Sequence, residues 1–163
     1  MTEKYVMKEN HIPDGILHDR DLYNIALEDN VLVLSFNIVY YPENYSNSFG
    51  EKYKDFKKCH IRCKLCEDVQ RECGVSLETA LKGKNLTYKG ILLDIEEFIP
   101  LANKEMKRRK EKGYYPWTYL STSISPDFRA ADIDLRIDLK YRHRTYTSSK
   151  ITVDTEEIEF VWE

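Results

Sequence analysis

Four cysteines within a short stretch are the residues of this sequence best suited to bind a metal. Cys59, Cys63 and Cys66 follow a C-x3-C-x2-C spacing in KKCHIRCKLCED, and Cys73 comes shortly afterwards. Cysteine thiolates hold zinc ions and iron–sulfur clusters. The spacing therefore raises two hypotheses, a metal site or an ordinary element of secondary structure.

Apolar and polar residues alternate strictly through the first part of this stretch. The apolar positions are Cys59, Ile61, Cys63 and Leu65, and the polar positions are Lys58, His60, Arg62 and Lys64. This period of two predicts a β-strand, in which Cys59 and Cys63 point the same way about 13 Å apart. One zinc ion with Zn–S bonds of about 2.3 Å cannot reach both sulfurs. Free cysteine also packs well as a small buried hydrophobe, so we expect a strand.

The same cysteine spacing resembles the cluster motif of radical SAM enzymes. Those enzymes carry the motif in a loop of a large βα barrel, whereas this chain shows no βα alternation and is too short for that barrel. A zinc site stays open as an alternative, with Cys63 or Cys66, Cys73 and one histidine as ligands. Past the end of the strand, Cys66 and Cys73 are the thiols that we expect to be exposed.

A second constellation lies in DGILHDRD, where His18 and Asp19 stand side by side between Asp14 and Asp21. A His–Asp pair can bind metal or transfer protons near neutral pH. The plainer interpretation is that both side chains bond backbone groups where the first hairpin opens. The alternative to a binding protein is thus a small metal-binding protein or enzyme that uses His18, Asp19, Cys66 and Cys73.

Clusters of charged residues are the next features that could bind a partner. Residues 104–112, KEMKRRKEK, hold six basic and two acidic residues, and RHR follows at 142–144. Interleaved glutamates and a net charge of −3 favour a solvated helix face over a nucleic-acid site, so no nucleic-acid partner is expected. Acidic residues are numerous toward both ends of the chain, and an acidic, tyrosine-bearing β-surface would suit a basic partner such as a nuclease toxin.

Length and composition indicate one ordinary globular unit. The 163 residues fit a single domain, 1–163, and 42% of them are hydrophobic while 33% are charged. No apolar stretch is long enough to span a membrane, and the first residues lack the apolar core of a signal peptide. We therefore expect a cytoplasmic protein with reduced cysteines and no membrane association.

The elements that must position these residues are mostly strands. DLYNIAL and VLVLSFNIVYY predict a hairpin around Asp29-Asn30, with Tyr23, Ile25 and Leu27 on one face. Further strands are predicted in NLTYKGILLDIEEF, in WTYLSTSIS and in DIDLRIDLKYRHR, whose Ile133 and Leu135 alternate with charged residues. KITV, a turn at DTEE and IEFVW predict a closing hairpin.

Three segments are predicted to be helical. CEDVQRECG and SLETALKG read as short helical turns that Gly74 and Gly83 close, and PLANKEMKRRKEKG reads as a helix from Pro100 to Gly113. The apolar face of that helix is thin, so we expect it on the surface. The predicted fold class is α+β, mainly antiparallel β-sheet of about seven or eight strands, curved or folded into a sandwich, with one or two short surface helices.

Aromatic residues in predicted loops are the candidate contact residues for a partner. The chain has 12 tyrosines, and tyrosine and tryptophan often dominate the energetics of protein interfaces. The loop tyrosines and the aromatic run after the predicted helix are the most accessible of them. The candidates are Tyr45, Tyr53, Tyr114, Tyr115 and Trp117.

The opening GILHDRDLYNIALEDNVLVLSF resembles small bacterial proteins of largely unknown function. Their pattern is Leu-His-Asp, a strand, an acidic-Asn turn and an apolar strand, and several such families are described as immunity proteins of polymorphic toxin systems. The matching residues are Leu17, His18, Asp19, Ile25, Asp29, Asn30, Leu32, Leu34 and Phe36. The resemblance, over about 25 residues, implies a β-rich cytoplasmic protein that binds another molecule.

Together these observations predict a protein-binding module that is not an enzyme and needs no cofactor. Its expected partner is another protein. The resemblance suggests an immunity protein that neutralises a bacterial toxin as the specific form.

Overall fold

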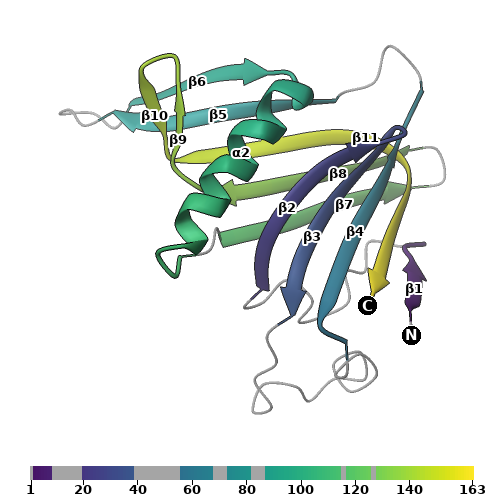
Figure 1. The fold of residues 1–163 in the computed structure, drawn as a ribbon. Helices are drawn as coiled ribbons and strands as arrows, with labels where there is room; N and C mark the ends of the chain where they lie inside the picture. The colour runs from purple at the N-terminus through teal and green to yellow at the C-terminus, as the bar shows by residue number, and fades with distance from the viewer. Residues whose placement is uncertain are drawn as a thin grey trace.

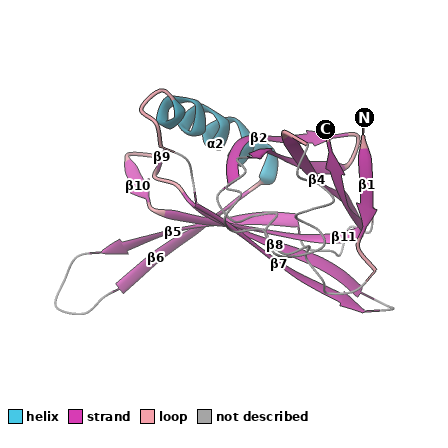
Figure 2. Ribbon diagram, turned by 90° about the horizontal axis from the view of Figure 1, so that it is seen from below, coloured by secondary structure: helices cyan, strands magenta, loops and turns pink. Residues whose placement is uncertain are grey.

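The computed structural model describes residues 2–8, 20–38, 56–67, 73–81, 87–114, 117–125 and 128–163. Within them lie eleven strands and the helix α2, Ile95–Lys110. The strands form a strongly curled antiparallel sheet, and α2 lies along one side of the curl (Figure 1; Figure 2). The predicted α+β class and the curved antiparallel sheet are confirmed, although the strands outnumber the seven or eight expected.

One long strand, β11 (Ser148–Trp162), organises the whole sheet. Its first half pairs with β5 (Cys73–Leu81) on one side and β8 (Phe128–Arg136) on the other. Its second half pairs with β4 (Lys58–Leu65) and β1 (Glu3–Val6). The register with β4 shifts between Thr155 and Glu157, which is where a bulge lets the strand bend.

Two layers therefore share β11. The first layer is β2-β3-β4-β11 with β1 at its far side, and the second is β6-β5-β11-β8-β7. The remaining strands of these layers are β2 (Arg20–Glu28), β3 (Val31–Ile38), β6 (Thr87–Leu93) and β7 (Trp117–Ser125). A separate two-stranded hairpin, β9 (Leu139–Tyr141) and β10 (Arg144–Tyr146), stands beside α2.

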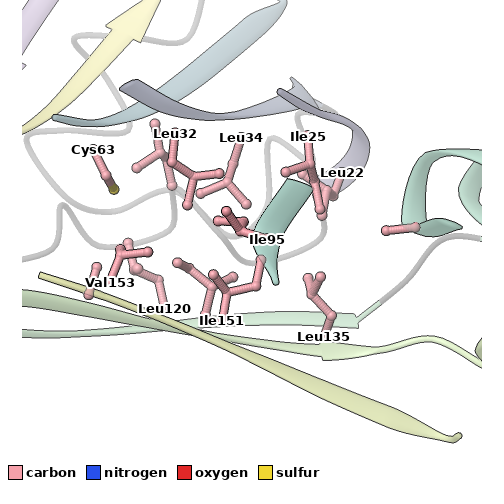
Figure 3. Packing of buried hydrophobic residues seen from close by; sticks show 14 of the residues in the cluster. Leu22, Ile25, Leu32, Leu34, Cys63, Ile95, Leu120, Leu135, Ile151 and Val153 are labelled. Atoms are coloured by element: carbon pink, nitrogen blue, oxygen red, sulfur yellow. The ribbon is translucent and has the colours of Figure 1, made fainter. Parts of the chain in front are cut away.

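The hydrophobic core fills the space between the two layers. Leu32, Leu34 and Cys63 point down from the first layer toward Leu120, Ile151 and Val153 of the second, and Ile95 of α2 enters between them (Figure 3). These side chains are at most 2% exposed. Burial of apolar area on this scale is the main stabilising contribution to such a fold.

The first predicted hairpin is confirmed. Asp29 and Asn30 both have positive φ, 46° and 64°, which is the conformation of a two-residue hairpin turn. The face assignment of Tyr23 was wrong, because the register shifts between Leu22 and Asn24. Leu22 and Ile25 are therefore the buried residues, while Tyr23 is only half-buried.

The predicted cysteine strand is also confirmed as β4. Cys59, Ile61, Cys63 and Leu65 are buried, and the polar residues between them are exposed or half-buried. Strict alternation of apolar and polar residues was thus sufficient to predict a strand that has one buried face and one solvent-exposed face.

The helix prediction was close at the end of α2 and wrong about its start. The helix ends at Lys110, three residues before the predicted Gly113, which lies in the turn that follows with φ 75°. The helix begins at Ile95, so Pro100 lies inside it rather than in its first turn. Ile95, Phe98, Ala102 and Met106 form a buried stripe at helical spacing, which makes the apolar face broader than expected.

Two other local predictions were wrong. The segment SLETALKG was expected to be helical, but Val75 and Leu77 are buried in strand β5, which pairs with β6 and β11. Residues 68–72 of the other predicted turn lie outside the described part of the chain. The closing hairpin is instead the single strand β11, and the predicted DTEE turn is its bulge.

The segment DIDLRIDLKYRHR keeps its predicted alternation but not its continuity. Ile133, Leu135, Ile137 and Leu139 are all buried. The backbone leaves the sheet after Arg136 and re-forms as the β9–β10 hairpin around Arg142 and His143, both with positive φ. Among the described helices, none is long and apolar enough to cross a membrane.

Candidate functional site

The cysteines do not converge on a metal site in the described part of the chain. Cys59 and Cys63 are fully buried in β4, Cys66 is half-buried after it, and Cys73 is exposed at the start of β5. No group of three or more His, Cys, Asp or Glu side chains suited to a metal ion occurs among the described residues. His18 and Asp19 of the alternative site lie outside those residues.

Burial of Cys63 makes stability depend on pH. Burial raises the pKa of the Cys63 thiol to about 12, whereas an unfolded thiol titrates near ~8.5. The folded state thus retains a proton that the unfolded state loses, so this contribution is complete below pH ~8.5 and disappears as the pH rises toward 12. We expect Cys63→Ala to flatten the fall of unfolding free energy above pH ~8.5, by at most about 1.4 kcal/mol per pH unit. Urea unfolding at several pH values measures this slope, and a slope equal to that of the wild type would contradict the prediction.

Of the predicted aromatic contact residues, Tyr114 is the one whose side chain the structure describes. It follows α2, is 66% exposed, and its backbone N–H donates to the carbonyl of Arg109. Trp117 opens β7 opposite Arg136, with its backbone alone described. Tyr45, Tyr53 and Tyr115 lie outside the described residues, so an aromatic contact surface stays a prediction.

A Ser–His–Glu row on the first layer has the contacts of a catalytic triad. The Ser35 hydroxyl lies 2.8 Å from Nδ1 of His60, and Nε2 of His60 lies 3.5 Å from a carboxylate oxygen of Glu163. Ser35 and His60 are simply opposite each other in the β3–β4 register. Ser35 is 4% exposed and its strand is paired on both sides, so neighbouring N–H groups belong to the sheet and cannot bind an oxyanion. The row therefore has a structural role.

Ion pairs run across the same outer face. Glu159 lies 3.6 Å from Lys4 and 3.9 Å from Arg62, and Glu156 lies 2.7 Å from Lys64. The cations come from β1 and β4, which flank β11. These acidic residues of β11 are thus matched by basic neighbours, which leaves this part of the predicted acidic surface largely neutral.

A wide cleft lies at the other side of the molecule. Its volume is about 880 Å³, and its walls come from β5, β6, the first turn of α2 and the β9–β10 hairpin. We call it the β6 cleft. Its lining includes Cys73, Leu92, Asp94, Glu97, Arg142 and Arg144. The β6–α2 segment and the β9–β10 hairpin that supply most of these residues are distant in sequence, so only the tertiary fold brings them together.

One hydrogen bond links two walls of the β6 cleft. The Tyr141 hydroxyl donates to a carboxylate oxygen of Glu97 at 2.7 Å, and this bond raises the pKa of the phenol. The Arg142 guanidinium lies over the Tyr141 ring, 5.1 Å from its centroid. The hairpin is therefore held against the start of α2, and Arg142 is oriented by its neighbour.

The floor of the cleft ends in an open strand edge. Among the described strands β6 pairs with β5 alone. The carbonyl of Glu78 in β5 accepts from Thr147 on the side away from β6, so alternation turns the peptide groups of Leu77 toward Ile91 of β6. Gly90 and Leu92 then turn their N–H and C=O groups outward. Leu92 is also 85% exposed, the highest value among the large hydrophobic residues described.

The edge of β2 shows what a closed edge looks like in this protein. The side chain of Asn103 in α2 accepts from the N–H of Ile25 at 2.9 Å and donates to its C=O at 2.7 Å. One amide thus takes the place of a neighbouring strand. Natural proteins usually cover or charge an exposed edge, so the exposed Leu92 side chain on the edge strand β6 stands out.

Neither Leu92 nor the β9–β10 arginines were predicted as site residues. A signal existed in ILL at 91–93, where three consecutive apolar residues break the alternation expected of a half-buried strand. No family model, curated protein or solved structure matches this chain.

Proposed function

We propose that this chain is a protein-binding module without enzymatic activity, which binds an extended segment of a partner protein along the open edge of β6. The observation that carries the proposal is Leu92, which is 85% exposed on a strand edge that no other described strand pairs with and that borders a cleft of about 880 Å³. An immunity protein that neutralises a bacterial toxin is the specific biological form that we propose.

Addition of a strand uses groups that β6 already presents. The outward N–H and C=O groups of Gly90 and Leu92 can bond the main chain of a partner segment, as in other complexes that extend a sheet. Main-chain bonds supply affinity, and the exposed Leu92 side chain supplies apolar contact. Its burial would contribute roughly 1.5–3 kcal/mol, enough to change affinity by tenfold or more.

A photo-crosslinking amino acid at position 92 tests the location of this site in the source cell. We expect one dominant protein adduct from position 92 and none from Ser121, an exposed residue on the opposite edge strand β7. The captured partner then allows a direct comparison of affinities. Leu92→Lys should weaken binding by roughly tenfold or more, because lysine on an edge opposes strand addition.

Ser121→Lys is the matched control, since it places the same charge on the other edge of the same layer. Its affinity should equal that of the wild type. Equal crosslinking from both positions, or unchanged affinity in Leu92→Lys, would rule out the β6 edge as the binding site.

A further inference from the structure

The structure joins two basic segments that are far apart in sequence. Residues 104–112 and 138–144 carry nine lysines and arginines against three acidic residues, although the whole chain has a net charge of −3. Arg109 of α2 reaches Asp138 before β9 at 2.5 Å, and a second cleft of about 450 Å³ lies between α2 and the hairpin, with Lys104, Arg108 and Lys140 in its walls. The two segments form one surface, which we call the cationic face.

Most charges of the cationic face are not compensated internally. Arg108 and Arg109 pair with Glu105, whose pKa these arginines lower, and Arg109 also pairs with Asp138. The other basic residues are exposed and form no ion pair with a described residue. These are Lys104, Lys107, Lys110, Lys112, Lys140, Arg142 and Arg144. On the outer face of β4 and β11, by contrast, Lys4, Arg62 and Lys64 all lie close to glutamates of β11.

The cationic face continues into the β6 cleft. Arg142 and Arg144 line the same cleft as Leu92, so an occupant of the β6 edge lies close to both arginines. Two carboxylates, Asp94 and Glu97, also line that cleft, and Glu97 accepts from Tyr141. They offset only part of the excess of six positive charges that residues 104–112 and 138–144 carry. An occupant that reaches the hairpin wall therefore meets more positive than negative groups.

From this geometry we infer that the partner segment bound at β6 is acidic, with carboxylates that contact Arg142 and Arg144 and apolar side chains that contact Leu92. This inference rests on the proposed function and specifies the chemistry of its partner. A protein segment fits better than nucleic acid, because the exposed apolar contact in the cleft is the aliphatic Leu92, and single-stranded nucleic acid is bound mainly through aromatic stacking. The sign is opposite to that of the basic partner suggested by residue counts alone.

Selection from a phage-displayed library of random peptides tests the inference without a known partner. A peptide length of about ten residues covers the length of a strand. Wild-type protein should enrich peptides in which apolar residues alternate with Asp or Glu, with acidic residues at least about twofold above the unselected library. That factor corresponds to about 0.4 kcal/mol.

Two charge variants isolate the role of the arginines. In Arg142→Glu/Arg144→Glu the acidic enrichment should fall to the library level. Lys8→Glu/Lys57→Glu changes the net charge equally at exposed residues outside the cationic face, and should keep the wild-type enrichment. All four side chains are exposed, so both variants should fold, which far-ultraviolet circular dichroism verifies.

The outcomes separate failure of the inference from failure of the proposed function. Peptides that need Leu92 yet show no acidic excess would overturn the inference and leave the β6 site in place. No enrichment by the wild type, or the same peptides enriched by Leu92→Lys, would overturn the proposed function itself. If oligouridine displaces a selected peptide near 0.15 M salt and binds more tightly than that peptide, the surface would be assigned to nucleic acid. If the protein forms a dimer that Leu92→Lys dissociates, the edge would be assigned to a second copy of this chain.

Discussion

Phe160→Ala should lower the free energy of unfolding by about 3–5 kcal/mol, the usual cost of removing a buried aromatic ring. Phe160 is fully buried in β11, between the rings of Tyr5 and Trp162, whose centroids lie 6.2 and 6.0 Å away. It pairs with Tyr5 of β1 and Ile61 of β4, so the lost contacts affect three strands at once. Against a total stability of roughly 5–15 kcal/mol, this loss is a large fraction.

Urea unfolding followed by circular dichroism measures this loss. Leu92→Ala is a useful control, because it removes apolar atoms from a side chain that is 85% exposed and should change stability by less than about 0.5 kcal/mol. Phe160→Leu keeps most of the buried volume and should fall between the two. Similar costs for Phe160→Ala and Leu92→Ala would mean that the second half of β11 is not packed as described.

Asn103→Ala should destabilise the protein by about 1–2 kcal/mol and open the edge of β2. The substitution leaves the N–H and C=O of Ile25 without their partner at 2.9 and 2.7 Å. A lost partner for a part-buried group costs about 1–3 kcal/mol, and the higher helix propensity of alanine offsets about half a kcal/mol of that. The freed edge should also raise the tendency to associate through β2.

Amide hydrogen exchange distinguishes this local effect from a general loss of stability. The Ile25 amide should exchange faster in Asn103→Ala by more than the change in global stability explains. Lys104→Ala, at the adjacent exposed helix position, should leave both quantities nearly unchanged. Protection of Ile25 equal to that of the wild type would show that the Asn103 side chain does not close this edge.

The parts of the fold that could be predicted are those in which local pattern and tertiary burial agree. In β4, and in the hairpin at Asp29-Asn30, alternation and turn chemistry alone were sufficient. The segment SLETAL has residues that favour a helix, but its position between β6 and β11 makes it a strand. Pairing with neighbours overrides weak local propensity, and those neighbours are distant in sequence.

The predicted boundaries of strands and helices were wrong where the same residue types are common in two kinds of local structure. Asp154 to Glu157 have turn-like character, yet β11 continues through them because strands flank it before and after the bulge. Asp94, Glu96 and Glu97 looked like the end of a strand, although acidic residues in that position also favour the start of a helix. Phe98 decides between them, since it completes the buried stripe with Ala102 and Met106.

The candidate site could not be predicted from the sequence because no single segment contains it. Leu92, Arg142 and Glu97 come from β6, the β9–β10 turn and α2. Each residue has an ordinary explanation in its own segment, as a strand residue, a turn residue and a helix-start residue. These residues become candidate binding residues only because they line the same cleft, and that cleft forms only when the hairpin packs against α2.

The position of β11 in the chain has a consequence for how this protein is made. The four strands that pair with β11 are β1, β4, β5 and β8, and the ribosome completes all of them before it synthesises β11. Neither layer can close until β11 has emerged, so the earlier strands wait with open edges and an uncovered apolar face. Such late, long-range pairing gives a high contact order and slow folding. The nascent chain is therefore most exposed to aggregation just before its central strand arrives.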